Sequence, residues 1–277
     1  MSETFGERLR ERLLEAGPLC VGIDPSRDVV RAWERDDTVE GAEYVALTTL
    51  EATIGVAAVV KCQVAFFERF GSAGVAVLER VLLEARAAEL IVIADAKRGD
   101  VSSTNEGYAQ AWLEDTSSLR VDALTVSPYL GVAALEPLFR VAEATARGVF
   151  VLAATSNVEG RMLQSARTNE HDRVHTMVLR EIARRNEGAE GLGSVGAVLG
   201  ATRARPEFDL TTMKGPFLVP GVGAQGASPT DVAHLFTGCV DGSITVNVAR
   251  AILAAGPEVR AVRDAAKRWR DELRGAL

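Results

Sequence analysis

The stretch Leu90-Ile91-Val92-Ile93-Ala94 runs directly into Asp95-Ala96-Lys97-Arg98-Gly99-Asp100. Its apolar half predicts a strand that is buried on both faces, as in a parallel sheet. Unpaired charges at the end of such a strand would be costly, so we expect the carboxylates and the ammonium to pair there. Because side chains alternate along a strand, Asp95 and Lys97 project to the same side, and Arg98 opposes them. The cluster is either a structural ion pair or a catalytic group of charges, and the rest of the chain has to decide between the two.

Short apolar runs of this kind recur along the chain and alternate with amphipathic segments. One such segment has Val75, Leu78 and Leu82 at helical spacing. This alternation predicts parallel strands joined by helices, in an α/β fold. Near-continuous apolar strands, each followed by a helix, favour a closed (β/α)8 TIM barrel over an open doubly wound sheet. The predicted strands are residues 19–23, 57–61, 90–95, 122–126, 149–153, 195–199, 217–220 and 243–247.

Three further segments are predicted to complete the barrel. Extra helices over residues 5–16 and near residues 29–33 would cover its ends, and residues 249–273 would close the ring of helices. The chain has 277 residues, of which 47% are hydrophobic. This length is typical of an α/β barrel with one core, so we expect a single domain over residues 1–277.

The composition argues against several kinds of partner. The net charge of -7 disfavours a nucleic-acid surface. No apolar run approaches the roughly 20 residues that a membrane-spanning helix needs, so we expect no membrane partner.

The cysteines indicate a reducing compartment, and the histidines do not indicate a metal site. Cys20, Cys62 and Cys239 are too widely spaced for a disulfide framework, and the N-terminus lacks the features of a signal peptide. A cytoplasmic location is therefore expected. His171 and His175 stand four residues apart on a predicted helix, a spacing that suits zinc, but no third ligand is evident.

The carboxyl ends of the predicted strands carry charged residues repeatedly. Asp24 follows the first strand, Lys61 ends the second, and Asp95, Lys97 and Asp100 end the third. In a (β/α)8 barrel these ends share one rim, where this fold carries its chemistry. A random surface would scatter such charges, so we expect a functional cluster at this rim.

The segment after the seventh predicted strand is rich in glycine. Gly221, Gly223 and Gly226 permit close backbone approach, Gln225 offers amide donors, and Arg250 follows the eighth strand. In this fold, the loops after the seventh and eighth strands commonly bind a phosphate through their backbone N–H groups. The glycines also spell G-x-G-x-x-G, but no acidic residue ends a second strand about 20 positions on, so a dinucleotide site is disfavoured. A plain tight turn is the remaining alternative.

Six segments of the chain match the motifs of one known family. Together they resemble the orotidine 5′-phosphate decarboxylases, specifically the longer branch found in actinobacteria. The resemblance covers nearly the whole chain. Members of this branch usually carry proline after the first lysine, where this chain has Cys62. The segments are GIDPS (22–26), VVKCQVAFFE (59–68), DAKRGDVSST (95–104), DALTVSPYLG (122–131), VFVLAATSN (149–157) and LVPGVGAQGA (218–227).

The resemblance implies a lyase that converts orotidine 5′-monophosphate to uridine 5′-monophosphate, the last step of de novo UMP synthesis. Loss of CO₂ leaves a carbanion at C6 of the pyrimidine, and electrostatics must stabilise it because the family uses no cofactor. By resemblance, Lys97 lies beside C6, stabilises the charge and delivers the proton. Asp95, Asp100 and Lys61 complete a Lys-Asp-Lys-Asp array, in which alternation keeps every group charged.

The resemblance also implies the contacts to the substrate. Asp24 would hold the ribose hydroxyls, and Ser156 would read the amide edge of the pyrimidine. Gln225 and Arg250 would hold the phosphate, and Pro220, at the start of the glycine-rich loop, would bind substrate beside them.

A homodimer with shared sites follows from the same resemblance. Asp100 and Thr104 are expected to enter the active site of the other subunit.

Three other functions remain as alternatives. A metal-dependent lyase of the wider superfamily, such as a hexulose-phosphate synthase or a keto-sugar-phosphate decarboxylase, would need an acidic magnesium ligand where this chain has Lys61. A Schiff-base aldolase would need Lys97 as a free amine, which flanking carboxylates disfavour. A non-catalytic barrel that binds a phosphate ligand would have no need for the alternating charges.

Overall fold

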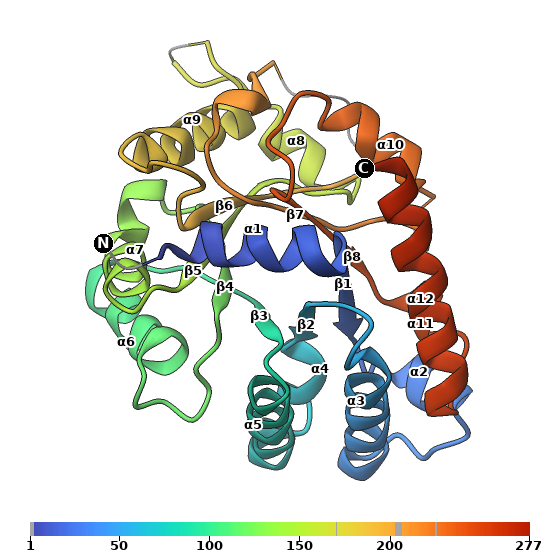
Figure 1. The fold of residues 1–277 in the computed structure, drawn as a ribbon. Coiled ribbons are helices and arrows are strands. Elements are labelled where there is room, and N and C mark those ends of the chain that lie inside the picture. The colour runs from blue at the N-terminus through green and yellow to red at the C-terminus, as the bar shows by residue number, and fades with distance from the viewer. Residues whose placement is uncertain (1–2, 170, 203–206, 225) are drawn as a thin grey trace.

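The computed structural model describes residues 3–169, 171–202, 207–224 and 226–277. Parallel strands form one closed barrel in the order β1 to β8, each paired with its neighbours in sequence (Figure 1). The predicted (β/α)8 barrel is therefore confirmed. The strands are β1 (Leu19–Ile23), β2 (Val59–Gln63), β3 (Ile91–Arg98), β4 (Ala123–Val126), β5 (Gly148–Ala154), β6 (Val195–Leu199), β7 (Phe217–Val219) and β8 (Ile244–Val248).

Two strands, β2 and β3, differ from prediction by more than one residue at an end. β2 begins at Val59 because the turn after the preceding helix continues, with the N–H of Ala57 donating to the carbonyl of Thr53. β3 continues past Asp95 to Arg98, since its pairing with β4 resumes beyond an irregularity. The extension of β3 comes from its pairing with β4, which a local pattern does not report.

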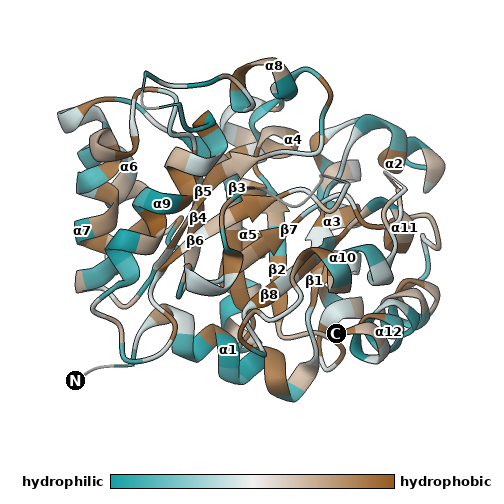
Figure 2. Ribbon diagram, turned by 90° about the horizontal axis from the view of Figure 1, so that it is seen from above, coloured by the Kyte–Doolittle hydropathy of each residue, from teal (hydrophilic) through white to brown (hydrophobic). Residues whose placement is uncertain are grey.

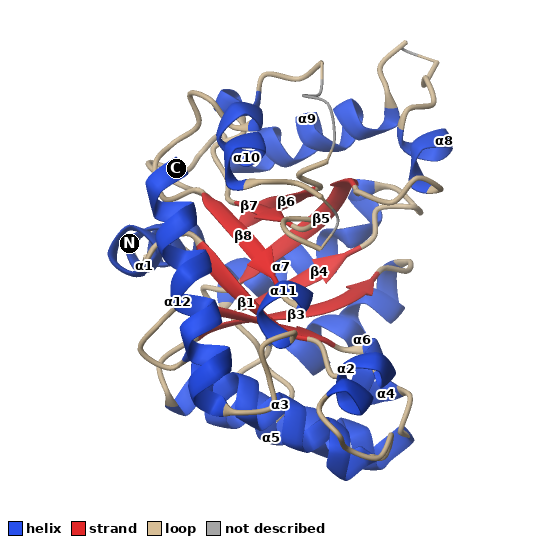
Figure 3. Ribbon diagram, turned by 90° about the vertical axis from the view of Figure 1, so that its right-hand side faces the viewer, coloured by secondary structure: helices blue, strands red, loops and turns tan. Residues whose placement is uncertain are grey.

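The helices form an outer layer around the barrel (Figure 3). They are α1 (Phe5–Ala16), α2 (Arg27–Ala32), α3 (Val39–Thr53), α4 (Ala65–Glu68), α5 (Gly71–Ala87), α6 (Ser102–Leu113), α7 (Glu136–Ala144), α8 (Gly160–Gln164), α9 (Val174–Asn186), α10 (Pro229–Leu235), α11 (Arg250–Leu253) and α12 (Val259–Ala276).

The N-terminal helix α1 lies across one end of the barrel (Figure 1). Its buried residues Phe5, Leu9 and Leu13 pack against side chains that fill the barrel interior. The ring of Phe5 meets the ring of Phe150 edge-on, with centroids 6.1 Å apart. The predicted helix over residues 5–16 and its covering role are therefore confirmed.

Side chains on each strand alternate between the barrel interior and the helical layer. On β2, Val60 and Cys62 pack outward in the core that the helices share, and the side chain of Lys61 enters the mouth of the barrel. Figure 2 shows hydrophobic residues concentrated on the strands and on the helix faces that cover them. Each fully buried aliphatic side chain contributes ~1.5–3 kcal/mol to folding.

The C-terminal segment closes the ring as two helices, α11 and α12. The short α11 follows β8 directly, and α12 packs against α3 and β1. Among the described residues, no helix is both long and apolar enough to cross a membrane.

Candidate functional site

An alternating row of charges lies at the carboxyl ends of β1, β2 and β3. The Lys61 ammonium is 2.9 Å from Oδ2 of Asp95, and the Lys97 ammonium is 2.6 Å from Oδ1 of the same carboxylate. Lys61 also lies 3.9 Å from Oδ1 of Asp24. Three strands that are separate in sequence therefore bring two lysines and two aspartates into one row.

An irregularity in β3 brings its charged side chains together. Ala94 and Arg98 pair with β4 residues that are only two positions apart, so β3 bulges over residues 95–97. Within this bulge Lys97 has φ 48°, in the left-handed region that few residues other than glycine adopt. Backbone strain of this kind concentrates at functional sites. Arg98, beyond the bulge, turns away and pairs with Glu68 of α4.

Burial and charge act in opposite directions on the pKa values of this row. Burial alone would lower the pKa of Lys61, but Asp95 and Asp24 outweigh it, so that this pKa is raised. Burial alone would raise the pKa of Asp95, but Lys61 and Lys97 outweigh it, so that this pKa is lowered. Lys61 and Asp95 therefore stay charged at physiological pH. For Asp24, burial outweighs Lys61 and the pKa is raised.

A cavity of about 170 Å³ opens beside this row, between the carboxyl ends of β1, β2, β3, β7 and β8. Gly221 and Gly223 line the turn after β7 with φ 100° and 74°, values that glycine adopts without strain. Within the described part of the chain, Arg250 makes no ion pair, and its side chain is exposed. The cavity is lined by Asp24, Lys61, Gln63, Asp95, Pro220, Gly221, Val222, Ala224, Asn247, Ala249 and Arg250.

The structure thus brings together six of the ten predicted site residues, namely Asp24, Lys61, Asp95, Lys97, Pro220 and Arg250. Gln225 lies outside the described residues. Ser156 follows β5 and is not among the residues that line this cavity.

Asp100 and Thr104 lie on the segment that follows β3, away from the row in their own chain. Among the described residues, no ion pair joins Asp100 to a lysine, and its carboxylate instead accepts the N–H of Val101. The buried side chain of Asn105 holds this segment by bonding the backbone of Asp100 and the carbonyl of Ala134. Within one chain, Asp24 rather than Asp100 completes the alternation of charges.

Sequence reasoning did not select three polar residues that contact the row or line the cavity. Gln63 accepts a hydrogen bond from the Lys61 ammonium at 3.3 Å, and Asn247 lines the cavity. Both lie near the ends of strands, two residues from a side chain that faces the barrel interior. Because side chains alternate along a strand, the sequence could have predicted that these two also face the interior. Thr125 on β4 donates to Asp95 at 3.0 Å. In sequence it is an ordinary β-branched strand residue, without a distinguishing signal.

The remaining candidates for chemistry have structural surroundings. Burial raises the pKa of the Cys62 thiol to about 12, so it is not a nucleophile at neutral pH. His171 lies in the turn before α9 and His175 lies within it, so the predicted shared helix was wrong. Within the residues that the structure describes, no cluster of three or more His, Cys, Asp or Glu could hold a metal ion.

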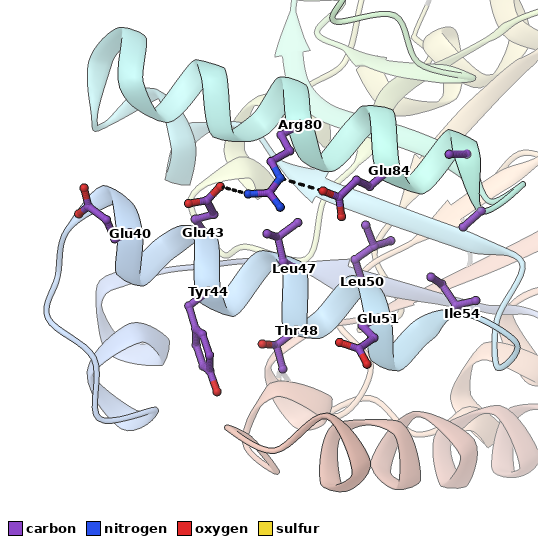
Figure 4. Close-up of a pocket in the computed structure, with 12 residues that line it drawn as sticks. Glu40, Glu43, Tyr44, Leu47, Thr48, Leu50, Glu51, Ile54, Arg80 and Glu84 are labelled. Atoms are coloured by element: carbon purple, nitrogen blue, oxygen red, sulfur yellow. Dashed lines mark hydrogen bonds and ion pairs between the residues drawn. The ribbon is translucent and has the colours of Figure 1, made fainter.

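A larger cavity of about 750 Å³ lies between α3 and α5, on the outside of the helical layer (Figure 4). Arg80 crosses it and pairs with Glu43 and Glu84, both at 2.8 Å. These are exposed ion pairs of small energetic value. The row of charges inside the barrel mouth is therefore the better candidate for chemistry.

The closed barrel and its row of paired charges define the class of (β/α)8 proteins that carry an electrostatic site on the carboxyl rim. The family model of the orotidine 5′-phosphate decarboxylase / HUMPS family matches residues 17–265. The chain belongs to this family, as its motifs predicted.

Full-length relatives agree with this assignment. The chain is 51% identical over 275 residues to the orotidine 5′-phosphate decarboxylase of Salinispora arenicola, covering 99% of each chain. It is 48% identical over 276 residues to that of Streptomyces coelicolor, also covering 99% of each. The expected actinobacterial branch is therefore confirmed.

Solved structures show the same fold. A crystal structure from Streptomyces avermitilis, described as a candidate orotidine 5′-phosphate decarboxylase, has a TM-score of 0.95 and 48% identity, covering 99% of this chain and 96% of that one. The structure of OMP decarboxylase from Leishmania donovani has a TM-score of 0.75 and 30% identity, covering 99% of both chains.

Proposed function

We propose that this chain catalyses the cofactor-free decarboxylation of orotidine 5′-monophosphate to uridine 5′-monophosphate, the last step of de novo UMP synthesis. The observation that carries the proposal is the Lys61-Asp95-Lys97 row, with Asp95 between the two ammonium groups at 2.9 Å and 2.6 Å. Family membership and relatives of that activity at about half identity over the full length support it.

The proposed chemistry needs a positive charge fixed beside C6. When the C6–CO₂ bond breaks, CO₂ leaves and the electron pair stays on C6 in the plane of the ring. Lys97 stabilises this pair and then transfers a proton from its ammonium to C6. Asp95, which Lys61 holds through its Oδ2, bonds the Lys97 ammonium through its Oδ1, so the position of the stabilising charge is organised before the reaction begins.

Substrate binding is assigned to the groups around the cavity. Asp24 has a buried oxygen, Oδ1, without a hydrogen-bond donor among the described residues, and this acceptor suits a ribose hydroxyl. Arg250, which makes no ion pair with the residues that the structure describes, offers its guanidinium for two phosphate oxygens. We assign the remaining predicted contacts to Pro220 and Gln225 at the phosphate and to Ser156 at the pyrimidine.

We further infer a homodimer in which each subunit lends Asp100 and Thr104 to its partner. Hydrophobic side chains are exposed next to these residues, since Val101 is 53% exposed and, on the loop after β4, Tyr129 is 75% exposed. The two loops are neighbours, because the N–H of Ser127, the residue after β4, donates to the carbonyl of Arg98 at the end of β3. A second subunit would cover this apolar surface and bring in a carboxylate.

The shared site predicts complementation between two inactive variants. Lys97→Ala and Asp100→Ala chains should each be nearly inactive, but a heterodimer would contain one site with both residues intact. At random exchange, half of the dimers are heterodimers with one good site in two, so roughly a quarter of wild-type activity per chain should return. The measurement is an assay of the two variants co-refolded in equal amounts.

The parents assayed separately are the control for complementation. Activity equal to the sum of the parents, despite heterodimers verified by mass, would show that Asp100 acts within its own chain.

The proposed function also predicts that metals have no effect on the rate. Lys61 puts an ammonium between Asp24 and Asp95, where it would repel a divalent cation. The absorbance change on loss of orotidine 5′-monophosphate should therefore proceed equally with EDTA and with added magnesium. A rate that EDTA abolishes and magnesium restores would favour a metal-dependent lyase, and an absence of turnover would favour a binding barrel.

We infer that residues 1–277 work as one barrel domain in the cytoplasm. Cys20 and Cys62 are buried as free thiols, which suits a reducing compartment.

A further inference from the structure

We propose that Thr125 of β4 is a positioning residue of this site, which holds both the backbone of Lys97 and the carboxylate of Asp95. Its side chain touches neither the cavity nor the predicted substrate contacts, so its effect is exerted through these two residues. The inference rests on the proposed function and assigns a further residue to it.

The hydroxyl of Thr125 makes two hydrogen bonds at once. Its Oγ1 accepts the backbone N–H of Lys97 at 3.0 Å and donates to Oδ1 of Asp95, also at 3.0 Å. The residue is only 1% exposed, so water does not compete for either bond. A hydroxyl is the side-chain group that can accept and donate in this way from one atom.

The bond to Lys97 supports the strained part of β3. The bulge places three β3 residues, 95–97, opposite Thr125 alone, between the pairs that Ala94 and Arg98 make with β4. The regular ladder therefore offers no β4 backbone partner for the Lys97 N–H at this point. The threonine hydroxyl takes that N–H, at a residue whose φ is 48°.

The bond to Asp95 fixes the orientation of the carboxylate. Oδ1 of Asp95 accepts from Thr125 and from the Lys97 ammonium, and Oδ2 accepts from the Lys61 ammonium. The lysine side chains are long and flexible, whereas Thr125 is β-branched and stands on a rigid strand. Of the three side chains that bond Asp95, Thr125 is therefore the short and rigid one, and Lys61 and Lys97 are the long ones.

Loss of this hydroxyl should lower the rate more than it lowers binding. Without it, the Lys97 backbone and the Asp95 carboxylate can both shift, and with them the ammonium that is to lie beside C6. Displacements of about 1 Å in such groups cost up to about 100-fold in rate. The phosphate and ribose contacts, which lie at β1, β7 and β8, would stay in place.

The test begins with Thr125→Val, which keeps the shape of the side chain and removes the hydroxyl. We expect kcat for orotidine 5′-monophosphate to fall about 10- to 100-fold, with KM within about 3-fold of wild type. The matched control is Thr245→Val on β8. Thr245 is also fully buried, and its Oγ1 has no partner among the described residues, so this variant should keep kcat within about 2-fold of wild type.

If Thr125→Val does not fold, a second pair of variants tests whether the hydroxyl of Thr125 is needed for the normal kcat. Thr125→Ser and Thr125→Ala both lack the γ-methyl group, and only the serine keeps a hydroxyl. We expect kcat of the serine variant within about 3-fold of wild type and kcat of the alanine variant at least about 10-fold below that of serine.

The outcomes separate this inference from the proposed function. A wild-type protein without decarboxylase activity would refute the function and the role of Thr125 with it. An active wild type with equal kcat in the serine and alanine variants, or with equal kcat in the two valine variants, would refute the role of Thr125 alone.

Discussion

Replacement of Lys97 by alanine is expected to lower kcat for orotidine 5′-monophosphate by about 10⁴-fold or more. The variant loses both the charge that stabilises the carbanion and the proton donor, and each such group is commonly worth 10²- to 10⁴-fold. The fold should persist, because the Lys97 side chain is 44% exposed and Asp95 keeps Lys61 as a partner. The measurements are kcat by absorbance, binding of uridine 5′-monophosphate by calorimetry, and Tm.

Lys267→Ala is the control for this variant, because Lys267 is an exposed lysine on α12, outside the barrel mouth. It should retain wild-type kcat. Near-normal turnover in Lys97→Ala would remove Lys97 from the chemistry, and loss of nucleotide binding along with turnover would mean that its role is in binding instead.

Replacement of Arg250 by alanine is expected to lower kcat/KM for the nucleotide by about 10³-fold, although this residue is assigned to the phosphate and not to C6. Binding energy from a part of the substrate that does not react can be used to reach the transition state. The exposed guanidinium of Arg250 at the cavity is suited to supply that energy. The measurement compares kcat/KM for the nucleotide and for orotidine, the nucleoside without phosphate.

The nucleoside is the internal control for the Arg250 variant, since its poor reaction should hardly change. Arg268→Ala, an exposed arginine of α12, controls for loss of a positive charge elsewhere. Equal losses with nucleotide and nucleoside would show that Arg250 has a structural role rather than a phosphate-binding one.

The barrel was predictable because local periodicity carries most of its information. β1 and β6 have the predicted bounds, and so does α1. The bounds of β2 and β3 were less accurate, because a strand ends where its neighbour ceases to pair with it. In β3, pairing resumes at Arg98 only because β4 lies beside it with a shifted register.

The candidate site was predictable to the extent that it follows from strand ends. Lys61, Asp95 and Lys97 were found because a buried strand that ends in charges is unusual, and the barrel puts such ends on one rim. Asp100 has the same sequence signal, but within its own chain it bonds Val101 and reaches neither lysine. Proximity in sequence could not distinguish an intramolecular contact from one made across a dimer.

By itself, the sequence determined the barrel, its covering helix and the charged residues of the rim, because hydrophobic periodicity and the cost of burying charge are local properties. Only the tertiary structure decided how those charges meet. The bulge that turns Lys97 back onto Asp95 and the Thr125 hydroxyl that holds both arise from the register between β3 and β4. That register depends on packing around the whole barrel, so no segment of the chain carries it alone.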